Sequence, residues 1–261
     1  DPVPAQDTDV AQDMDAMLAD EPEIAADIEE CEEDDGPVRL FHSCGGIEIG
    51  GWINGGTYYN NSGNNNTNGN APVAFVGDHG PIALNQAWIY AEKAIDTECG
   101  CDWGFRVDYI WGADSNNTDA FGDQSAFDFA WDSSRVYGSA VPQLYAQYGC
   151  CDWNVKVGHF YTIIGYEVVG APNNFFYTHA YTMNYGEPFT HTGFLFEKSA
   201  MCDQVTLWAG WSNGWDSYFG NYLDGSTFLG GASVALSYCQ TVTWACTFGD
   251  FGDGTPRNSN D

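Results

Sequence analysis

Every second residue from Trp103 to Trp111 is apolar within residues 102–114, which read DWGFRVDYIWGAD. Arg106 and Asp108 occupy positions between the apolar ones. Successive side chains of a β-strand point to opposite faces, so this pattern predicts a strand with one polar and one apolar face. The apolar set is mostly aromatic: Trp103, Phe105, Val107, Tyr109 and Trp111.

The same period of two recurs from residue 46 onward and predicts about nine strands. The connections alternate in length: turns such as GCC and YCQ are tight, whereas the other connections are long and rich in Asn, Gly and aromatic residues. Short turns at one end and long loops at the other are typical of an up-and-down antiparallel meander. We expect the strands over residues 46–60, 84–95, 102–114, 140–149, 152–165, 191–200, 204–216, 228–238 and 242–250.

Alternation alone does not say which face meets water, because soluble sheets and outer-membrane barrels both alternate. Trp103 and Trp111 are eight residues apart on one face, and so are Trp153 and Tyr161. Eight tilted residues rise about 20 Å, close to the roughly 25 Å apolar band that aromatic girdles bound in outer-membrane barrels. We therefore predict an all-β, up-and-down antiparallel transmembrane β-barrel in which these four residues form the membrane girdle.

The composition limits the partners. The formal net charge is −30, with 37 acidic and seven basic residues, which excludes a nucleic-acid-binding surface. Residues 1–35 hold 15 acids and no base, so we expect an acidic N-terminal extension and linker over residues 1–45 and barrel strands over 46–261. Ca²⁺ suits such an acidic field, and we expect no other cofactor. No apolar run is long enough for a transmembrane helix, whereas barrel strands are short and half polar.

A resemblance to a known family covers about residues 46–220. The segment VKVGHFYTIIGYEVVGAPNNFFYTHAYTMNYGEPFTHTGFL, residues 155–195, resembles the OmpL-like family of outer-membrane β-barrel porins most closely. GGWINGGTYYN, LNQAWIYAEKA, DWGFRVDYIWGAD and AVPQLYAQ are similar to the preceding strands of that family. The resemblance implies a bacterial outer-membrane location and a pore role, and it supplies no solute and no binding residue. The chain ends in the polar DFGDGTPRNSND, so we expect these strands to form an incomplete or truncated barrel.

Three charged residues fall on the predicted lumen face of neighbouring hairpins: Arg106, Asp108 and Lys156. They could form a charged constriction that sets ion selectivity, or an ion-pair network that braces the wall. The faces of Glu92 and Glu197 are less clear from the pattern.

The loop over residues 166–190 carries many aromatic residues together with Glu167 and Glu187. It could fold into the lumen and narrow it, which makes both carboxylates candidate pore-lining groups, or it could form an outer lid. The histidines are too scattered to predict a metal site.

The nine cysteines do not have zinc spacing, and their positions favour an oxidising compartment. When the chain is threaded through the meander, eight of them gather at the end with short turns. We expect disulfides between neighbouring turns and at least one that ties the N-terminal segment to this rim; reduced thiols are the alternative. The candidates are Cys31, Cys44, Cys99, Cys101, Cys150, Cys151, Cys202 and Cys239.

We therefore expect an outer-membrane porin for passive diffusion of small hydrophilic solutes, with a preference for cations and its N-terminal segment in the periplasm. Its partners would be outer-membrane lipid and those solutes, and a homo-oligomer or an envelope partner stays open. One alternative is a structural envelope or surface-array protein that is anchored by a barrel and binds Ca²⁺ or a partner through its acidic segment. Another is a soluble carbohydrate-binding β-sandwich, suggested by the many Trp and Tyr residues. We expect no enzyme, because the common hydrolase, zinc-protease and phosphate-loop motifs do not occur.

Overall fold

In the computed structural model the chain falls into two units, residues 1–36 and 37–261, and every described residue belongs to the second. The predictions for the acidic extension lie outside the described residues. The structure describes residues 38–42 (backbone only), 46–57, 82–98, 100–122, 137–201, 203–221 and 223–252.

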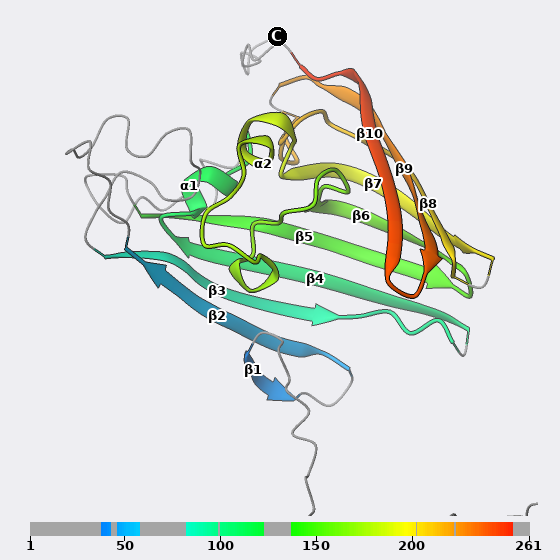
Figure 1. Ribbon diagram of the computed structural model, residues 1–261, viewed down its shortest axis with the longest axis horizontal. Coiled ribbons are helices and arrows are strands. Elements are labelled where there is room, and N and C mark those ends of the chain that lie inside the picture. The colour runs from blue at the N-terminus through cyan, green and yellow to red at the C-terminus, as the bar shows by residue number, and fades with distance from the viewer. Residues whose placement is uncertain are drawn as a thin grey trace, which may run out of the picture. The chain divides into compact units, whose positions relative to one another are not determined.

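Ten antiparallel strands form one sheet, and their order in the sheet follows their order in the chain (Figure 1). This is the up-and-down meander that the turn lengths predict. A β-sandwich needs two packed sheets, whereas the strands that the structure describes form one sheet, which does not match the fold of the soluble carbohydrate-binding alternative. The strands are β1 (Val38–His42), β2 (Glu48–Gly56), β3 (Ala83–Lys93), β4 (Cys101–Gly112), β5 (Gly138–Cys150), β6 (Trp153–Tyr161), β7 (Thr190–Ala200), β8 (Val205–Ser212), β9 (Ser226–Ser237) and β10 (Gln240–Asp250).

The nine expected strands correspond to β2–β10, and β1 is additional. It lies in the segment expected to be a linker, and Val38 pairs with Gly51 of β2. A run of five residues is too short for alternation to distinguish it from a linker. Among the described strands β1 and β10 are the two edges, and the sheet is not closed between them, although Figure 1 shows it curling strongly.

Short and long connections lie at opposite ends of the sheet. Two-residue turns join β5 to β6 and β9 to β10, and Cys151 in the first of them has a left-handed φ of 53°. Where they are described, the long connections carry three short helices: α1 (Ser115–Thr118), the 3₁₀-helix η1 (Ala171–Asn173) and α2 (Tyr181–Gly186). In the described part of the chain, no helix is long and apolar enough to span a membrane.

The two faces of the sheet have inverted polarity compared with a soluble sheet. In β4, Asp108 is 0% exposed and Ile110 is also buried, whereas Trp103 on the opposite face is 58% exposed. We call the face that carries Asp108 the inner face and the other the outer face. Exposed large apolar side chains continue around the outer face from β2 to β10: Ile53, Ile89, Val107, Tyr148, Val157, Phe194, Phe196, Leu207, Trp211, Phe228, Val242, Trp244 and Phe248.

The connection between β6 and β7, residues 162–189, packs against the inner face. Its Val169 and Met183 are buried in one cluster with wall residues of β3, β4 and β5. Figure 1 shows this connection, including α2, within the concavity of the sheet. We call it the inner segment. The wall residues of this cluster are Trp88, Tyr90, Ile110 and Ala140.

Candidate pore lining and constriction

A network of charged and polar side chains crosses the inner face from β2 to β5. The guanidinium of Arg106 donates from Nη1 to Glu92 Oε2 at 2.7 Å and from Nε to Asp108 Oδ1 at 2.8 Å. Gln143 on β5 donates to the second oxygen of Asp108 at 2.8 Å. Arg106 also lies over the ring of Tyr90 at 4.7 Å, and the hydroxyl of Tyr90 donates to Glu48 on β2. Two of the three predicted lumen residues therefore form one ion-paired group.

A second polar chain continues the network from β5 to β8. Gln147 Nε2 donates to Asn154 Oδ1 at 2.9 Å, and Asn154 Nδ2 donates to Glu197 Oε1 at 3.0 Å. The indole of Trp208 donates to the other carboxylate oxygen of Glu197 at 2.7 Å. Glu92 and Glu197, whose faces the sequence left unclear, both belong to the inner face. We call the two chains together the inner belt.

Lys156, the third predicted lumen residue, is bound differently. Its ammonium lies 4.4 Å from the ring centre of Tyr145 and 5.9 Å from that of Phe160. Within the described part of the chain no carboxylate is within salt-bridge distance of Lys156. It is therefore a cation held by aromatic faces beside the inner belt.

Gln86 fixes the inner segment to the wall. Its Nε2 donates to Val169 O at 2.7 Å and to Asp114 Oδ2 at 2.9 Å. Its Oε1 accepts from Trp52 Nε1 at 2.8 Å and from the backbone N–H of Ala171 at 3.0 Å. Both donor hydrogens and both acceptor positions of this amide are used, so its orientation is fixed.

Asp114, after β4, orients the neighbouring amides. It also accepts from Asn85 Nδ2 at 3.0 Å, and Asn85 Oδ1 accepts from the hydroxyl of Tyr177 in the inner segment at 2.8 Å. Burial raises the pKa of Asp114 to about 6, and the bonds from Asn85 and Gln86 oppose that rise. One buried carboxylate thus supports two attachments of the inner segment.

Glu167 and Glu187 both lie in the inner segment, which the structure places inside the concavity. That both carboxylates line a pore stays a prediction. Both line a small cavity of about 40 Å³ together with Tyr161 and Met183. Glu167 accepts from the backbone N–H of Ala180 at 2.7 Å. Burial raises the pKa of Glu187, and the nearby negative charge of Glu167 adds to that rise.

The predicted girdle residues lie at three kinds of position. Trp103 is exposed on the outer face, and the ring of Trp153 stacks on that of Phe196 at 6.0 Å. Trp111 stacks on Tyr137 at 5.7 Å at the other end of the sheet. Tyr161 packs against the inner cluster instead, because β6 ends there and the chain turns inward; its assignment to the girdle is wrong. That the other three meet lipid stays a prediction.

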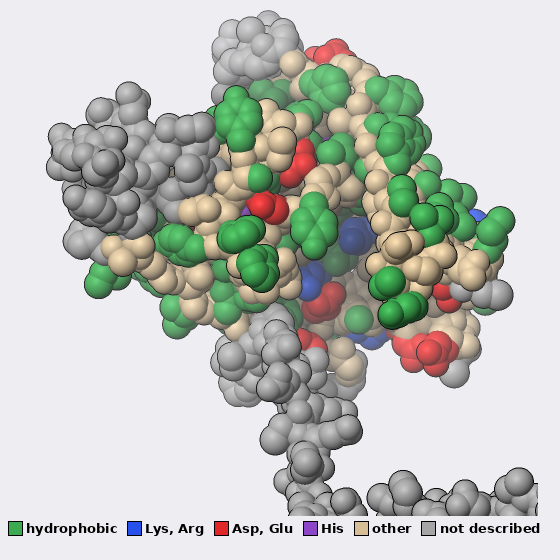
Figure 2. Space-filling view, viewed as in Figure 1, with side chains coloured by type: hydrophobic (Ala, Val, Ile, Leu, Met, Phe, Trp, Pro, Cys, Tyr) green, Lys and Arg blue, Asp and Glu red, His purple; other side chains and the backbone are tan. Residues whose placement is uncertain are grey.

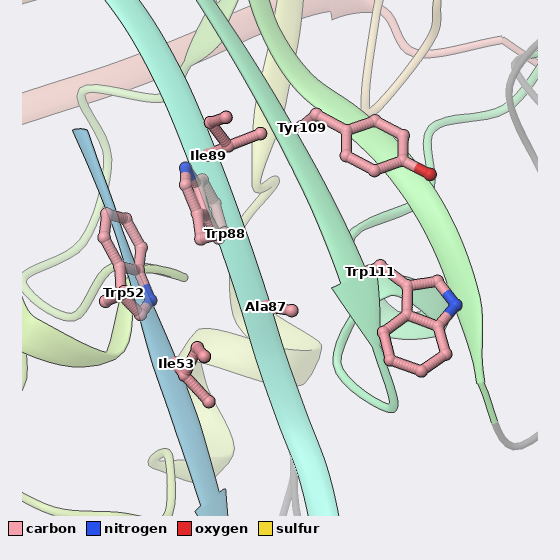
Figure 3. A pocket seen from close by; sticks show the side chains of 7 residues that line it. All are labelled: Trp52, Ile53, Ala87, Trp88, Ile89, Tyr109 and Trp111. Carbon is pink, nitrogen blue, oxygen red and sulfur yellow. The ribbon is translucent and has the colours of Figure 1, made fainter. Parts of the chain in front are cut away.

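An apolar groove of about 510 Å³ lies on the outer face over β2, β3 and β4 (Figure 3). Ala87 is the smallest of its lining residues, so the groove lies over Ala87 and the larger side chains around it form its sides. Its outer-face lining is Ile53, Ala87, Ile89, Tyr109 and Trp111; Trp52 and Trp88 also border it, although their side chains pack in the inner cluster.

One disulfide links two neighbouring turns at the short-turn end. Cys101 and Cys150 stand directly opposite each other in the register of β4 and β5, with Cα atoms 4.0 Å apart. The prediction of a bridge between adjacent turns is confirmed for this pair. It is wrong for Cys151 and Cys239, which are free thiols because they stand in turns rather than opposite another cysteine. The remaining four candidates lie outside the described residues: Cys31, Cys44, Cys99 and Cys202.

Three histidines of the described chain are buried: Nδ1 of His179 lies 3.5 Å from Glu167 Oε2, and the other two are bound by hydroxyl groups. His159 Nδ1 lies 2.8 Å from Thr192 Oγ1, and His191 Nε2 lies 3.0 Å from Thr162 Oγ1. Among the residues that the structure describes, no group of His, Cys, Asp and Glu is arranged to hold a metal ion. Binding of Ca²⁺ by the protein stays a prediction.

Sequence reasoning missed Gln86 and Asp114. The bond from Gln86 to Val169 joins residues 83 positions apart, so no local pattern indicates it. The only signal in the sequence is an Asn-Gln pair within the mainly apolar stretch 83–91, where an amide needs a buried partner.

An outer face of exposed apolar residues around a polar inner face defines the class of outer-membrane β-barrels. The family model described as "Putative beta-barrel porin-2, OmpL-like" matches residues 46–261, so the chain belongs to this family of β-barrel porins. The resemblance seen in the sequence is confirmed. No curated protein and no solved structure matches the chain.

Proposed function

We propose that this protein is an outer-membrane porin that passes small hydrophilic solutes by passive diffusion and prefers cations. Family membership supports the porin class. The inverted polarity of the sheet supports contact of its outer face with lipid hydrocarbon.

The inner belt carries the argument for cation preference. It contains Arg106 and lies beside Lys156, and the inner segment adds the carboxylates Glu167 and Glu187. Fixed carboxylates along a pore raise the local concentration of cations and lower that of anions. The carboxylates of the belt outnumber these two cations: Glu48, Glu92, Asp108 and Glu197.

The orientation follows from the connection lengths. In outer-membrane barrels the short turns face the periplasm and the long loops face outside. The turn that carries Cys151 would then be periplasmic, and the mouth beside α1 would be external.

Planar-bilayer recording tests this function. Purified full-length protein should give discrete conductance steps in KCl, and detergent alone should give none. In a KCl gradient the reversal potential should have the sign of cation preference. A reversal potential of the opposite sign would refute the selectivity, and a lack of steps with correctly folded protein would favour a structural envelope role instead.

A further inference from the structure

Lys156 and Glu197 are opposite charges on the inner face, and neither is ion-paired. Among the described residues, no oppositely charged side chain lies within salt-bridge distance of either. Both residues are partly exposed, so a solute in the lumen can reach them. Figure 2 shows basic and acidic side chains close together inside a hollow of this surface. Each of the two residues is therefore a candidate contact for a charged group of a solute.

The strand register makes these two residues diagonal neighbours. Lys156 on β6 stands opposite Leu195 on β7, whereas Glu197, two positions further along β7, stands opposite Asn154. Two residues of a strand span about 7 Å, and long side chains reach across such a diagonal. Among the charged groups that the structure describes, Glu197 exerts the strongest electrostatic effect on Lys156. The two charges are thus neighbours that do not touch.

Aromatic rings draw the ammonium of Lys156 away from Glu197. The ammonium lies 4.4 Å from the ring centre of Tyr145 and 5.9 Å from that of Phe160. Gly158, the inner-face position between Lys156 and Phe160, has no side chain to prevent this arrangement, and it stands opposite Tyr145 in the register. Both rings therefore belong to strand positions on the side of Lys156 that is remote from the row of Glu197.

Neutral donors hold the carboxylate of Glu197 in its own row. Asn154 Nδ2 donates to one oxygen at 3.0 Å, and Trp208 Nε1 donates to the other at 2.7 Å. Since both donors are uncharged, these bonds leave the negative charge uncompensated, and each carboxylate oxygen can accept a second hydrogen bond. Leu195, the neighbour of both charges on the inner face, belongs to a buried apolar cluster with Phe160. An apolar surface therefore adjoins the two charges.

The two charges together select among solutes. A solute with a single charge meets one of them favourably and the other as a like charge, which costs free energy. A solute with both a carboxylate and an ammonium makes a charge-assisted hydrogen bond to each. An α-amino acid carries these two groups on one carbon, so it is small enough to lie between neighbouring residues, and an apolar side chain can cover Leu195.

We propose that Lys156 and Glu197 form a binding subsite for zwitterionic amino acids with apolar side chains. The ammonium of Lys156 donates to the carboxylate of the amino acid, and the carboxylate of Glu197 accepts from its ammonium. This inference rests on the proposed porin function, since it names a class of solute that the pore would pass. It goes beyond the general preference for cations, because such a solute carries no net charge.

Titration calorimetry with L-leucine on the detergent-solubilised full chain tests the subsite. Two analogues each lack one charge: 3-methylbutylamine has no carboxylate, and 4-methylpentanoate has no ammonium. Leucine should bind at least about tenfold more tightly than either analogue, because a hydrogen bond to a charged group contributes about that factor or more. Binding of either analogue as tightly as leucine by the wild-type protein would overturn the proposal.

Each charge also has its own variant. Lys156→Met should weaken binding of leucine about tenfold and leave binding of 3-methylbutylamine unchanged. Glu197→Gln should weaken binding of leucine by a similar factor and leave binding of 4-methylpentanoate unchanged. Lys156→Arg keeps the cation and should retain most of the affinity for leucine. Unchanged leucine binding in Lys156→Met and Glu197→Gln, or an equal loss for all three compounds in both variants, would overturn the proposal.

The matched controls make the same substitutions outside the inner belt. Lys198→Met removes a cation that is exposed and paired with Asp152, and Glu98→Gln neutralises an exposed carboxylate before β4. Both controls should bind leucine as the wild type does. A loss in either control as large as that in Lys156→Met would mean that leucine responds to overall charge, and the subsite would be refuted.

Conductance separates this inference from the porin function. A protein that conducts K⁺ and binds leucine no better than its analogues overturns the subsite alone. A protein that binds leucine with the predicted order of analogues and variants but gives no conductance overturns the porin function and leaves the subsite standing.

Discussion

Replacement of Arg106 by Met should strongly destabilise the barrel wall. Arg106 is the only cation that contacts Asp108 in the described structure, and the side chain of Asp108 is 0% exposed. Removal of one partner from a buried ion pair leaves an uncompensated charge and costs about 3–5 kcal/mol. Glu92, the second partner, is 29% exposed and water can reach it, so we expect a loss near the lower end, about 3 kcal/mol.

Lys198→Met is the matched control. Lys198 Nζ lies 2.6 Å from Asp152 Oδ2, a distance as short as those of Arg106, but the two side chains are 45% and 54% exposed. Exposed pairs contribute about 0–1 kcal/mol, so this variant should unfold almost as wild type does. The same change from cation to methionine is thus made in a buried and in an exposed environment.

Urea unfolding of protein refolded into detergent micelles, followed by heat-modifiable mobility on gels, gives both free energies of unfolding. Asp108→Asn added to Arg106→Met should recover part of the loss, because it removes the buried charge and keeps an oxygen for the bond from Gln143. Equal losses in Arg106→Met and Lys198→Met, or no recovery in the double variant, would refute the view that burial of Asp108 makes this network stabilising.

Three further results are expected. Removal of the disulfide by Cys101→Ala/Cys150→Ala should lower the free energy of unfolding by up to about 4 kcal/mol, because the bridge closes a loop with a sequence separation of 49. Urea titrations of the wild type and the variant, with and without reductant, measure this loss, and equal free energies of unfolding would contradict the prediction. Burial raises the pKa of Asp216 to about 6 from 3.8, so the folded state binds this proton more tightly than the unfolded state, and stability should fall as pH rises from about 4 to 6. Asp216→Asn should reduce this pH dependence of stability, since the amide oxygen can accept the same hydrogen bonds from Phe189 and Thr190. If the variant lost as much free energy of unfolding between pH 4 and pH 7 as the wild type does, Asp216 would not be the group responsible. Lys156→Met should increase cation preference, because it removes a cation that no described carboxylate pairs, and a reversal potential that shifts toward anions would exclude this role.

Alternation made the strands and their faces predictable from the sequence. In β4 every second residue from Trp103 is apolar and mostly aromatic, so Trp103 and Asp108 fall on opposite faces by the pattern alone. The same rule failed at Tyr161, where the strand ends and alternation no longer describes the direction of the side chain. It also failed for β1, whose five residues pair only at the edge of the sheet.

Contacts between distant segments were not predictable. The inner segment was a candidate for either the lumen or an outer lid, because its aromatic composition suits both. Its position is decided by the amide of Gln86 and the carboxylate of Asp114, which meet it only after the sheet has formed. The disulfide was predictable in kind from the meander, but the choice of Cys150 rather than Cys151 depends on strand register.

The inverted polarity of the sheet also divides the tryptophans into two spectroscopic groups. Trp103 and Trp244 are exposed on the outer face, whereas Trp208 is bound to Glu197 on the inner face. In a bilayer, lipids brominated along the acyl chain would quench the emission of the first group, and a small water-soluble quencher that enters the lumen would reach only the second. If the outer face meets lipid as we propose, the intrinsic fluorescence would report insertion into lipid and opening of the lumen as two separate signals, without any attached label.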